Sequence, residues 1–235
     1  FSIFLGIAIN RIQNDYSSSL KHFFSSCFAV IMKMTEYVMA FAPIGIFGLI
    51  TFQVATADYS VFLKVGLYML TVFLGLMIHL CIALPLIFYL FTQINPIHHF
   101  KAMSTALLTA FSTSSSNATM PVTMRCLEKN VGISNKIRSF VIPLGATINM
   151  DGTALYECAG VLFIAQVIGY PIGLPEQLII IITALLASIG AAGVPSAGLV
   201  MIFIVTDAVG LNDPAVPLII GTMLAVDRPL DMLRT

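Results

Sequence analysis

The chain has 235 residues, of which 58% are hydrophobic and only 9% are charged. A soluble globular domain usually carries about a quarter charged residues, so this composition excludes a water-covered surface of the ordinary kind. The net charge is zero, which argues against nucleic acid as a partner. We therefore expect a protein whose solvent is the lipid bilayer.

Several apolar runs reach the length of about 20 residues that a helix needs to cross a bilayer. They contain Gly, Ser, Thr and Pro rather than the alternation typical of membrane strands, which predicts an all-α polytopic membrane protein. Basic residues favour the cytoplasmic side, and they concentrate in three loops, at residues 11–33, 92–103 and 124–139. The predicted spans then run alternately outward and inward, at residues 31–54, 62–93, 139–168 and 215 to the end.

Two further apolar segments do not fit this alternation. Residues 105–123 have basic loops on both sides, whereas residues 178–206 have loops without basic residues on both sides. Each segment must therefore leave and re-enter on one side, as a hairpin, and Gly and Pro in "SIGAAGVPSAG" supply the break in the second. Non-helical backbone at membrane depth requires protein or a water-filled cavity around it. The order hairpin, span, hairpin, span predicts an inverted repeat around a central substrate site.

The first hairpin contains "STSSSNATMP", residues 112–121. Its hydroxyls and the free N–H groups of a broken helix predict a site for an anionic group. The alternative is close packing between membrane helices, which Ser and Thr also favour.

The span after it contains "GATINMDGTALYE", residues 145–157. An aspartate at the bilayer centre is costly unless it is paired or binds a cation, and this span has no Lys or Arg. Oxygen-only ligands disfavour zinc and copper, so we expect Asp151 and its neighbours to bind sodium. The alternative is a structural Asp151 that hydrogen-bonds a broken helix.

Glu157 follows in the same span without a basic neighbour. Desolvation favours the protonated form of such a carboxyl group, so Glu157 is a candidate proton carrier. The alternative is a glutamate that only makes hydrogen bonds.

The last ten residues gather four charges after an apolar run. Asp227, Asp231 and Arg234 share one helix face, and the two carboxylates repel each other unless positive charge intervenes. A substrate with both an amino and a carboxyl group fits this face, with its ammonium on Asp231 and its carboxylate on Arg234. The alternative is a face that neutralises itself through internal ion pairs.

Four motifs together resemble one family: "TSSSNATMP", "PLGATINMDGTALYE", "ASIGAAGVPSAG" and "DRPLDMLRT". In this order and spacing they are similar to the dicarboxylate/amino acid:cation symporters, which include archaeal aspartate transporters and animal excitatory amino acid transporters. The resemblance covers the whole chain and implies an elevator-type fold with two opposed hairpins, assembled as a homotrimer in the plasma (inner) membrane. It implies a scaffold part over residues 1–60, a span over 61–104, and a transport domain over 105–235.

The resemblance also implies the roles of individual residues. The substrate, an acidic amino acid, is expected on Ser115, Ser116, Thr153, Val194, Gly198, Asp231, Arg234 and Thr235. Sodium is expected on Gly145, Thr147, Asn149, Asp151, Ser188, Ile189 and Ala191. Glu157 is expected to carry a proton, with Met150 and Asp227 supporting the two sites.

Three departures from the family pattern bear on these expectations. Archaeal members carry Arg where this chain has Ser114, and animal members carry it where this chain has Met232; Arg228 is a candidate substitute. Glu157 matches the animal members. Both ends of the chain resemble the middle of helices, so we expect a piece of a longer protein, without the first three spans and the final Asn and Asp of a sodium site.

Four competing functions remain open at this point. A neutral amino acid exchanger disagrees with Arg234, because a guanidinium left unpaired in a membrane is costly. A sodium-independent, proton-driven carrier of C4-dicarboxylates or glutamate agrees with Glu157. An intramembrane aspartyl protease would use two aspartates but lacks its GxGD motif here, and a purely structural subunit leaves the polar clusters unexplained. We therefore expect a symporter rather than an enzyme.

Overall fold

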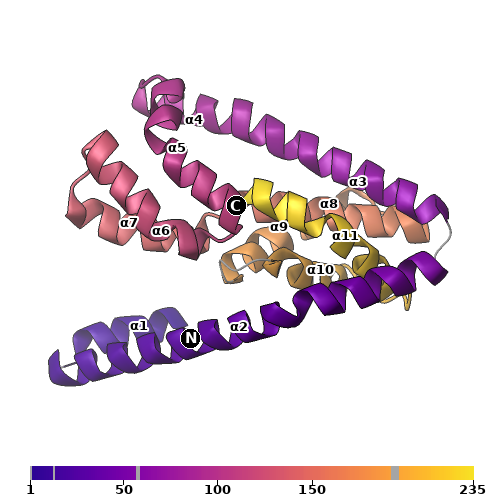
Figure 1. The fold of residues 1–235 in the computed structure, drawn as a ribbon, viewed down its shortest axis with the longest axis horizontal. Coiled ribbons are helices and arrows are strands. Elements are labelled where there is room, and N and C mark those ends of the chain that lie inside the picture. Colours follow the sequence, from indigo (N-terminus) through magenta and orange to yellow (C-terminus); the bar gives the residue numbers. More distant parts are fainter. Residues whose placement is uncertain (1, 13, 57–58, 192–195) are drawn as a thin grey trace. The chain divides into compact units, whose positions relative to one another are not determined.

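The computed structural model describes residues 2–12, 14–56, 59–191 and 196–235. Within these ranges every regular element is a helix, which confirms the all-α prediction (Figure 1). The chain divides into two compact units, Phe1–Thr51 and Phe52–Thr235, and each is described by itself.

The first unit consists of α1 (Ser2–Arg11) and most of α2 (Asn14–Thr56). The predicted span 31–54 lies within α2. Large apolar side chains are exposed along this helix, among them Phe41, Ile44 and Phe47. Such a surface is unfavourable in water and suits contact with lipid or with other apolar protein surface.

The second unit begins with one long apolar path through α3 (Tyr59–Ile78), η1 (His79–Ala83) and α4 (Leu84–Thr92). The segment η1 is a single π-helical stretch, a feature that often marks functional sites. Gln93 ends α4 in a left-handed conformation. Within the described residues, 63–92 and 135–168 are long and apolar enough to cross a membrane.

A helix, a short break and a second helix follow, at the position of the first predicted hairpin. Asn95 caps α5 (Pro96–Thr113) by accepting a hydrogen bond from the backbone of Ile97. Ser115 in turn caps α6 (Ser116–Cys126), which continues into η2 (Leu127–Val131). The helices α5 and α6 pack against each other, beside α7 (Figure 1).

The predicted span 139–168 contains a break at its polar centre. It consists of α7 (Asn135–Ile148) and α8 (Asp151–Ile168), separated by Asn149 and Met150. The backbone of both residues lies outside the helical region. This break exposes backbone groups beside Asp151, where the cation was expected.

The remaining helices surround α8. They are α9 (Leu174–Gly190), α10 (Ala197–Ala208) and α11 (Val216–Arg234), and α8 contacts all three as well as α3. The core side chains include Tyr156, Val161 and Ile164 of α8, which are fully buried. Since α8 is central, its polar side chains Tyr156 and Glu157 are fully buried inside protein. The inverted repeat and the elevator arrangement remain predictions.

Candidate substrate and cation site

The charged residues of α11 form one buried cluster. The Nε and Nη2 atoms of Arg234 donate to Oδ1 of Asp231 at 2.9 and 2.6 Å. Nη2 also lies 3.8 Å from Oδ1 of Asp227, and all three side chains are 2% or 3% exposed. Arg228, which is half exposed, lies 3.8 Å from the other oxygen of Asp231. The structure therefore brings together the face predicted from the sequence, with Arg234 paired to the chain's own carboxylates.

Two further groups fix this cluster in place. The hydroxyl of Tyr156 donates to Oδ1 of Asp227 at 2.9 Å, and the guanidinium of Arg234 lies 4.2 Å above the Tyr156 ring. The backbone N–H of Ser196 donates to Oδ2 of Asp231 at 3.0 Å. Buried charges are stable only when they are paired and hydrogen-bonded, and these contacts supply that condition. Neither Tyr156 nor Ser196 was predicted from the sequence to belong to the site.

One atom of the cluster has no polar partner. Within the described chain, Nη1 of Arg234 is buried and makes no hydrogen bond. It lies against the backbone of Gly198, where an added Cβ would be only 2.1 Å from Nη1. Position 198 therefore admits only glycine in this arrangement. The Nη1 atom of Arg234 is available to a ligand that enters beside that atom.

A cavity of about 40 Å³ lies beside this atom. Ten of the described residues line it, and six of them were predicted to contact the substrate: Ser116, Thr153, Gly198, Asp231, Arg234 and Thr235. Ser115 lies next to it as the cap of α6, and Val194 is outside the described residues. Ligand pockets usually measure hundreds of Å³, so this cavity is too small for an amino acid unless the surrounding groups rearrange.

Two serines at this cavity hold strained backbone conformations. Ser114, which lines it, has φ of +51°, and Ser196, next to the lining residue Ala197, has φ of +61°. Positive φ is uncommon outside glycine and clusters at functional sites. Each serine lies one or two positions before the start of a half-helix, so the two breaks meet at the same cavity.

Asp151 has a partner that the sequence analysis did not identify. One of its carboxylate oxygens is bonded to Nε2 of His79, from the π-helical segment η1. The Asp151 side chain is 40% exposed, so its other oxygen remains open to a ligand. The signal in the sequence was a lone histidine in the apolar span 62–93, but 72 residues separate the pair.

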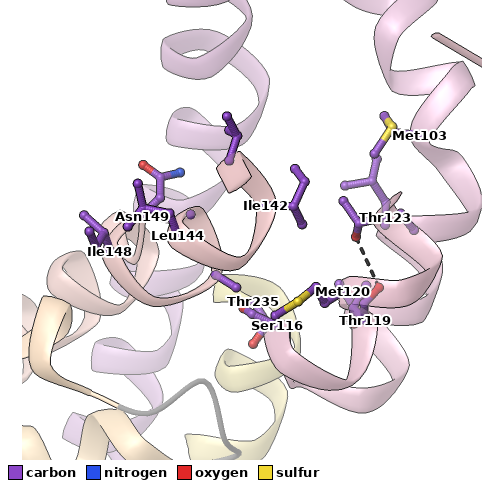
Figure 2. A pocket seen from close by; sticks show the side chains of 16 residues that line it. Met103, Ser116, Thr119, Met120, Thr123, Ile142, Leu144, Ile148, Asn149 and Thr235 are labelled. Carbon is purple, nitrogen blue, oxygen red and sulfur yellow. Dashed lines mark hydrogen bonds between the residues drawn. The ribbon is translucent and has the colours of Figure 1, made fainter. Parts of the chain in front are cut away.

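Two larger hollows adjoin the small cavity. One of about 590 Å³ lies between α5, α6 and α7, with Ser116, Asn149 and Thr235 on its wall (Figure 2). Another of about 470 Å³ is lined by residues that include His79 and Asp151. Asn149 and Thr235 border all three spaces, so the break between α7 and α8 connects the expected substrate and cation groups.

Comparison with known proteins gives the family. The chain matches the Sodium:dicarboxylate symporter family over residues 1–235. It belongs to this family. The chain is 45% identical over 236 residues to human Excitatory amino acid transporter 3 and 45% identical over 237 residues to Excitatory amino acid transporter 1 of Ambystoma tigrinum. It is 44% identical over 237 residues to Excitatory amino acid transporter 4 of Mus musculus.

These alignments include 100% of the chain but only 44%, 43% and 41% of the respective relatives. The chain therefore spans less than half the length of the curated relatives that it matches. The resemblance inferred from the four motifs is confirmed, and both the family and these relatives are transporters rather than enzymes.

The predicted cation ligands would bind through oxygen atoms. This agrees with the sodium in the name of the family. Within the described chain, no three His, Cys, Asp or Glu side chains gather into a metal site. Asn149 ends α7 two residues before Asp151, and its backbone N–H donates to the carbonyl of Gly145 at 2.9 Å. These groups suit a hard cation bound by carboxylate, amide and carbonyl oxygens.

The second predicted group of sodium ligands is less assembled. The hydroxyls of Thr147 and Ser188 both donate to carbonyls of their own helices, at 3.0 Å each. Ile189 is 44% exposed and Ala191 is buried at the end of α9. Although α7 and α9 are in contact, this second cation site remains a prediction.

Glu157 lies in the core of the second unit. It is fully buried, and neither carboxylate oxygen has a hydrogen-bond partner within the described chain. An ionised carboxylate without a partner is very costly inside protein, so the arrangement favours the protonated form. Glu157 therefore remains a candidate proton site.

Proposed function

We propose that the protein carrying this chain is a secondary active symporter of acidic amino acids, L-aspartate or L-glutamate, driven by a sodium gradient. The observation that carries this proposal is the buried Asp231–Arg234 pair. It lies beside a cavity that is lined both by the break between α5 and α6 and by the start of α10. The names of the relatives, excitatory amino acid transporters of a sodium:dicarboxylate family, support the same substrate class.

Substrate binding follows from an exchange of ion-pair partners. In the structure Arg234 and Asp231 neutralise each other. An acidic amino acid offers a carboxylate to Arg234 and an ammonium to Asp231, so both buried charges stay paired while the internal pair opens. The remaining carboxylate of the substrate then faces the N-terminus of α6, where Ser115 and Ser116 begin the helix.

Sodium coupling is assigned to the break between α7 and α8. Asn149 and Met150 line the small cavity, and Asp151 follows directly. A cation held there by Asp151 and neighbouring oxygens would fix the break in one geometry, and with it Met150 and Thr153 on the substrate side. Ion and substrate binding would therefore favour each other, since each orders groups that the other needs.

A second candidate, a sodium-independent carrier driven by protons, is favoured by one observation. Glu157 is fully buried and has no hydrogen-bond partner in the described chain. A carboxyl group in that position can bind and release a proton as its surroundings open and close. We therefore propose that protons are co-transported together with sodium.

The fold supports an elevator mechanism in a multi-pass protein of the plasma membrane. Residues 105–235 contain the two broken-helix segments and all predicted binding groups, and they would move together past residues 1–60, which would provide the scaffold of a homotrimer in lipid. Broken helices at membrane depth are typical of transporters in which one repeat moves against a fixed part.

The proposal is tested by uptake into proteoliposomes containing the complete gene product. Labelled L-aspartate and L-glutamate are offered under an inward sodium gradient, an inward proton gradient, or neither, with Arg234→Ala and Glu157→Gln as variants. We expect sodium-driven accumulation that Arg234→Ala abolishes, and a pH dependence that Glu157→Gln removes. Accumulation under the proton gradient alone would establish the second candidate, and no accumulation under any gradient would rule out both.

A further inference from the structure

One exposed surface of the second unit is strongly basic and has no role in the proposed transport site. Four cations gather at the end of the α5–α6 pair that is remote from the small cavity: Lys101, Arg125, Lys129 and Lys136. All four side chains are exposed. We call these four residues the basic end.

Hydrogen bonds join the three segments that bear these cations. The side-chain amide of Asn130, next to Lys129, donates to the carbonyl of Ala102, next to Lys101, at 2.6 Å. Nη1 of Arg138 donates to the carbonyl of Met124, next to Arg125, at 3.3 Å. The starts of α5 and α7 are therefore tied to the end of α6, so the segments that bear the four cations lie together at this end of the α5–α6 pair.

The negative charge of this surface is already neutralised. Glu128 is the only carboxylate between residues 90 and 140, and its Oε2 lies 2.6 Å from Nη1 of Arg138. No cation of the basic end lies within ion-pair distance of a carboxylate in the described chain. The surface therefore keeps four uncompensated positive charges.

Exposed apolar side chains lie among these charges. Ile97, Ile137 and Phe140 are 63%, 55% and 69% exposed, and they belong to the first turns of the same helices, α5 and α7. Cations interleaved with exposed apolar groups are typical of a surface at the boundary between lipid headgroups and acyl chains.

We propose that the basic end binds the headgroups of anionic phospholipids in the cytoplasmic leaflet. Clusters of Lys and Arg beside a membrane attract such lipids, and the apolar side chains anchor the contact in the same layer. The inference rests on the proposed membrane topology, which places these loops in the cytoplasm. Because α6 begins with Ser116 at the substrate cavity, lipid bound at the far end of the helix restrains the hairpin that holds the site.

A fluorescent reporter at Phe140 tests this inference directly. The chain contains no Trp, so Phe140→Trp in the complete gene product, with any other Trp replaced by Phe, reports on this surface alone. The reporter protein is placed in nanodiscs that contain increasing fractions of brominated phosphatidylserine or brominated phosphatidylcholine. We expect phosphatidylserine to quench at lower mole fraction, by up to about fivefold for each cation that contributes.

Three variants separate this binding from general effects. Replacing the four cations of the basic end by Gln should abolish the preference for phosphatidylserine, whereas Glu128→Gln, which frees Arg138, should increase it. Lys64→Gln is the control, because this exposed lysine is predicted on the opposite side of the membrane. Equal quenching by both lipids, or a preference that survives removal of the four cations, would overturn the inference.

Aspartate uptake by the same reporter proteins separates this inference from the proposed function. Uptake without any preference for phosphatidylserine would overturn the lipid site and leave the symporter proposal intact. A phosphatidylserine preference without uptake would support the lipid site and count against the symporter proposal.

Discussion

Glycine at position 152 is required because the end of α11 lies directly on it. A Cβ there would be 2.7 Å from the backbone carbonyl oxygen of Arg234, which cannot rotate away as a side chain can. We expect Gly152→Ala to destabilise the protein by about 1–3 kcal/mol, as overpacking usually does, and to displace Arg234 from Asp231. Thermal unfolding in detergent measures the first effect and aspartate binding the second. Gly66→Ala is the control, since among the described residues a Cβ there meets nothing within 4 Å; an equal effect of both would contradict this contact.

The hydroxyl of Tyr156 is the hydrogen-bond donor that stabilises Asp227. Tyr156→Phe keeps the ring beneath Arg234 but removes the 2.9 Å bond to the buried carboxylate. We expect a loss of about 1–3 kcal/mol in stability, because the carboxylate loses a partner that water cannot replace. Tyr170→Phe, at a residue that is 40% exposed, should change stability by less than about 0.5 kcal/mol. Thermal unfolding compares the two, and indistinguishable midpoints would show that the bond is unimportant.

At the scale of elements, the break between α5 and α6 depends on a helix cap. The hydroxyl of Ser115 accepts from the backbone N–H of Ala118 at 3.2 Å. We expect Ser115→Ala to lower stability by about 0.5–2 kcal/mol and to weaken substrate binding, because the N-terminus of α6 loses its order. Ser112→Ala in the same segment removes an exposed hydroxyl bonded only to its own helix and should have little effect. Chemical denaturation and substrate binding are measured for both variants. Similar losses of stability and affinity in the two would contradict the capping role of Ser115.

The contact between η2 and α7 should depend on pH. Its hydrogen bond with Arg138 holds the pKa of the Glu128 carboxyl below its usual range. A carboxyl group with a lowered pKa stabilises the folded protein above its ordinary pKa, and this contribution disappears as the pH falls through the lowered value. We expect Glu128→Gln to unfold at a lower temperature than the wild type at neutral pH, with the difference vanishing in acid. Because Glu128 is exposed, the difference in unfolding temperature should be small. A difference that grows in acid would show that the ionised Glu128 does not stabilise the folded protein through Arg138.

Across the whole molecule, the sequence predicted the features that follow from local patterns. The apolar runs predicted helices, whereas the break at Asn149 and Met150 was not predicted as such: a broken helix near Asp151 was considered only as the alternative to a cation site. Spacing alone placed Asp227, Asp231 and Arg234 on one face of α11. These features are accessible because a helix fixes which side chains share a face.

Features that depend on tertiary packing were not predictable in this way. His79 meets Asp151, and Tyr156 meets Asp227, across 72 and 71 residues of sequence. The internal pairing of Arg234 with Asp231 was weighed only as an alternative, since the sequence does not show how far the site is closed. The self-neutralising face and the substrate role are compatible, because a zwitterionic ligand would replace the internal pair of Arg234 and Asp231.

The central claim is that Asp231 binds an ammonium group while Arg234 binds a carboxylate. Calorimetric titration of the complete gene product in sodium, with L-aspartate and with succinate, which lacks the ammonium, tests it most directly. We predict that Asp231→Asn weakens L-aspartate binding by about 2–5 kcal/mol and removes its advantage over succinate, whereas Asp207→Asn, at an exposed aspartate of α10, leaves both unchanged. If Asp231→Asn weakened both ligands equally, or neither, Asp231 would not be the ammonium site and the account would be wrong.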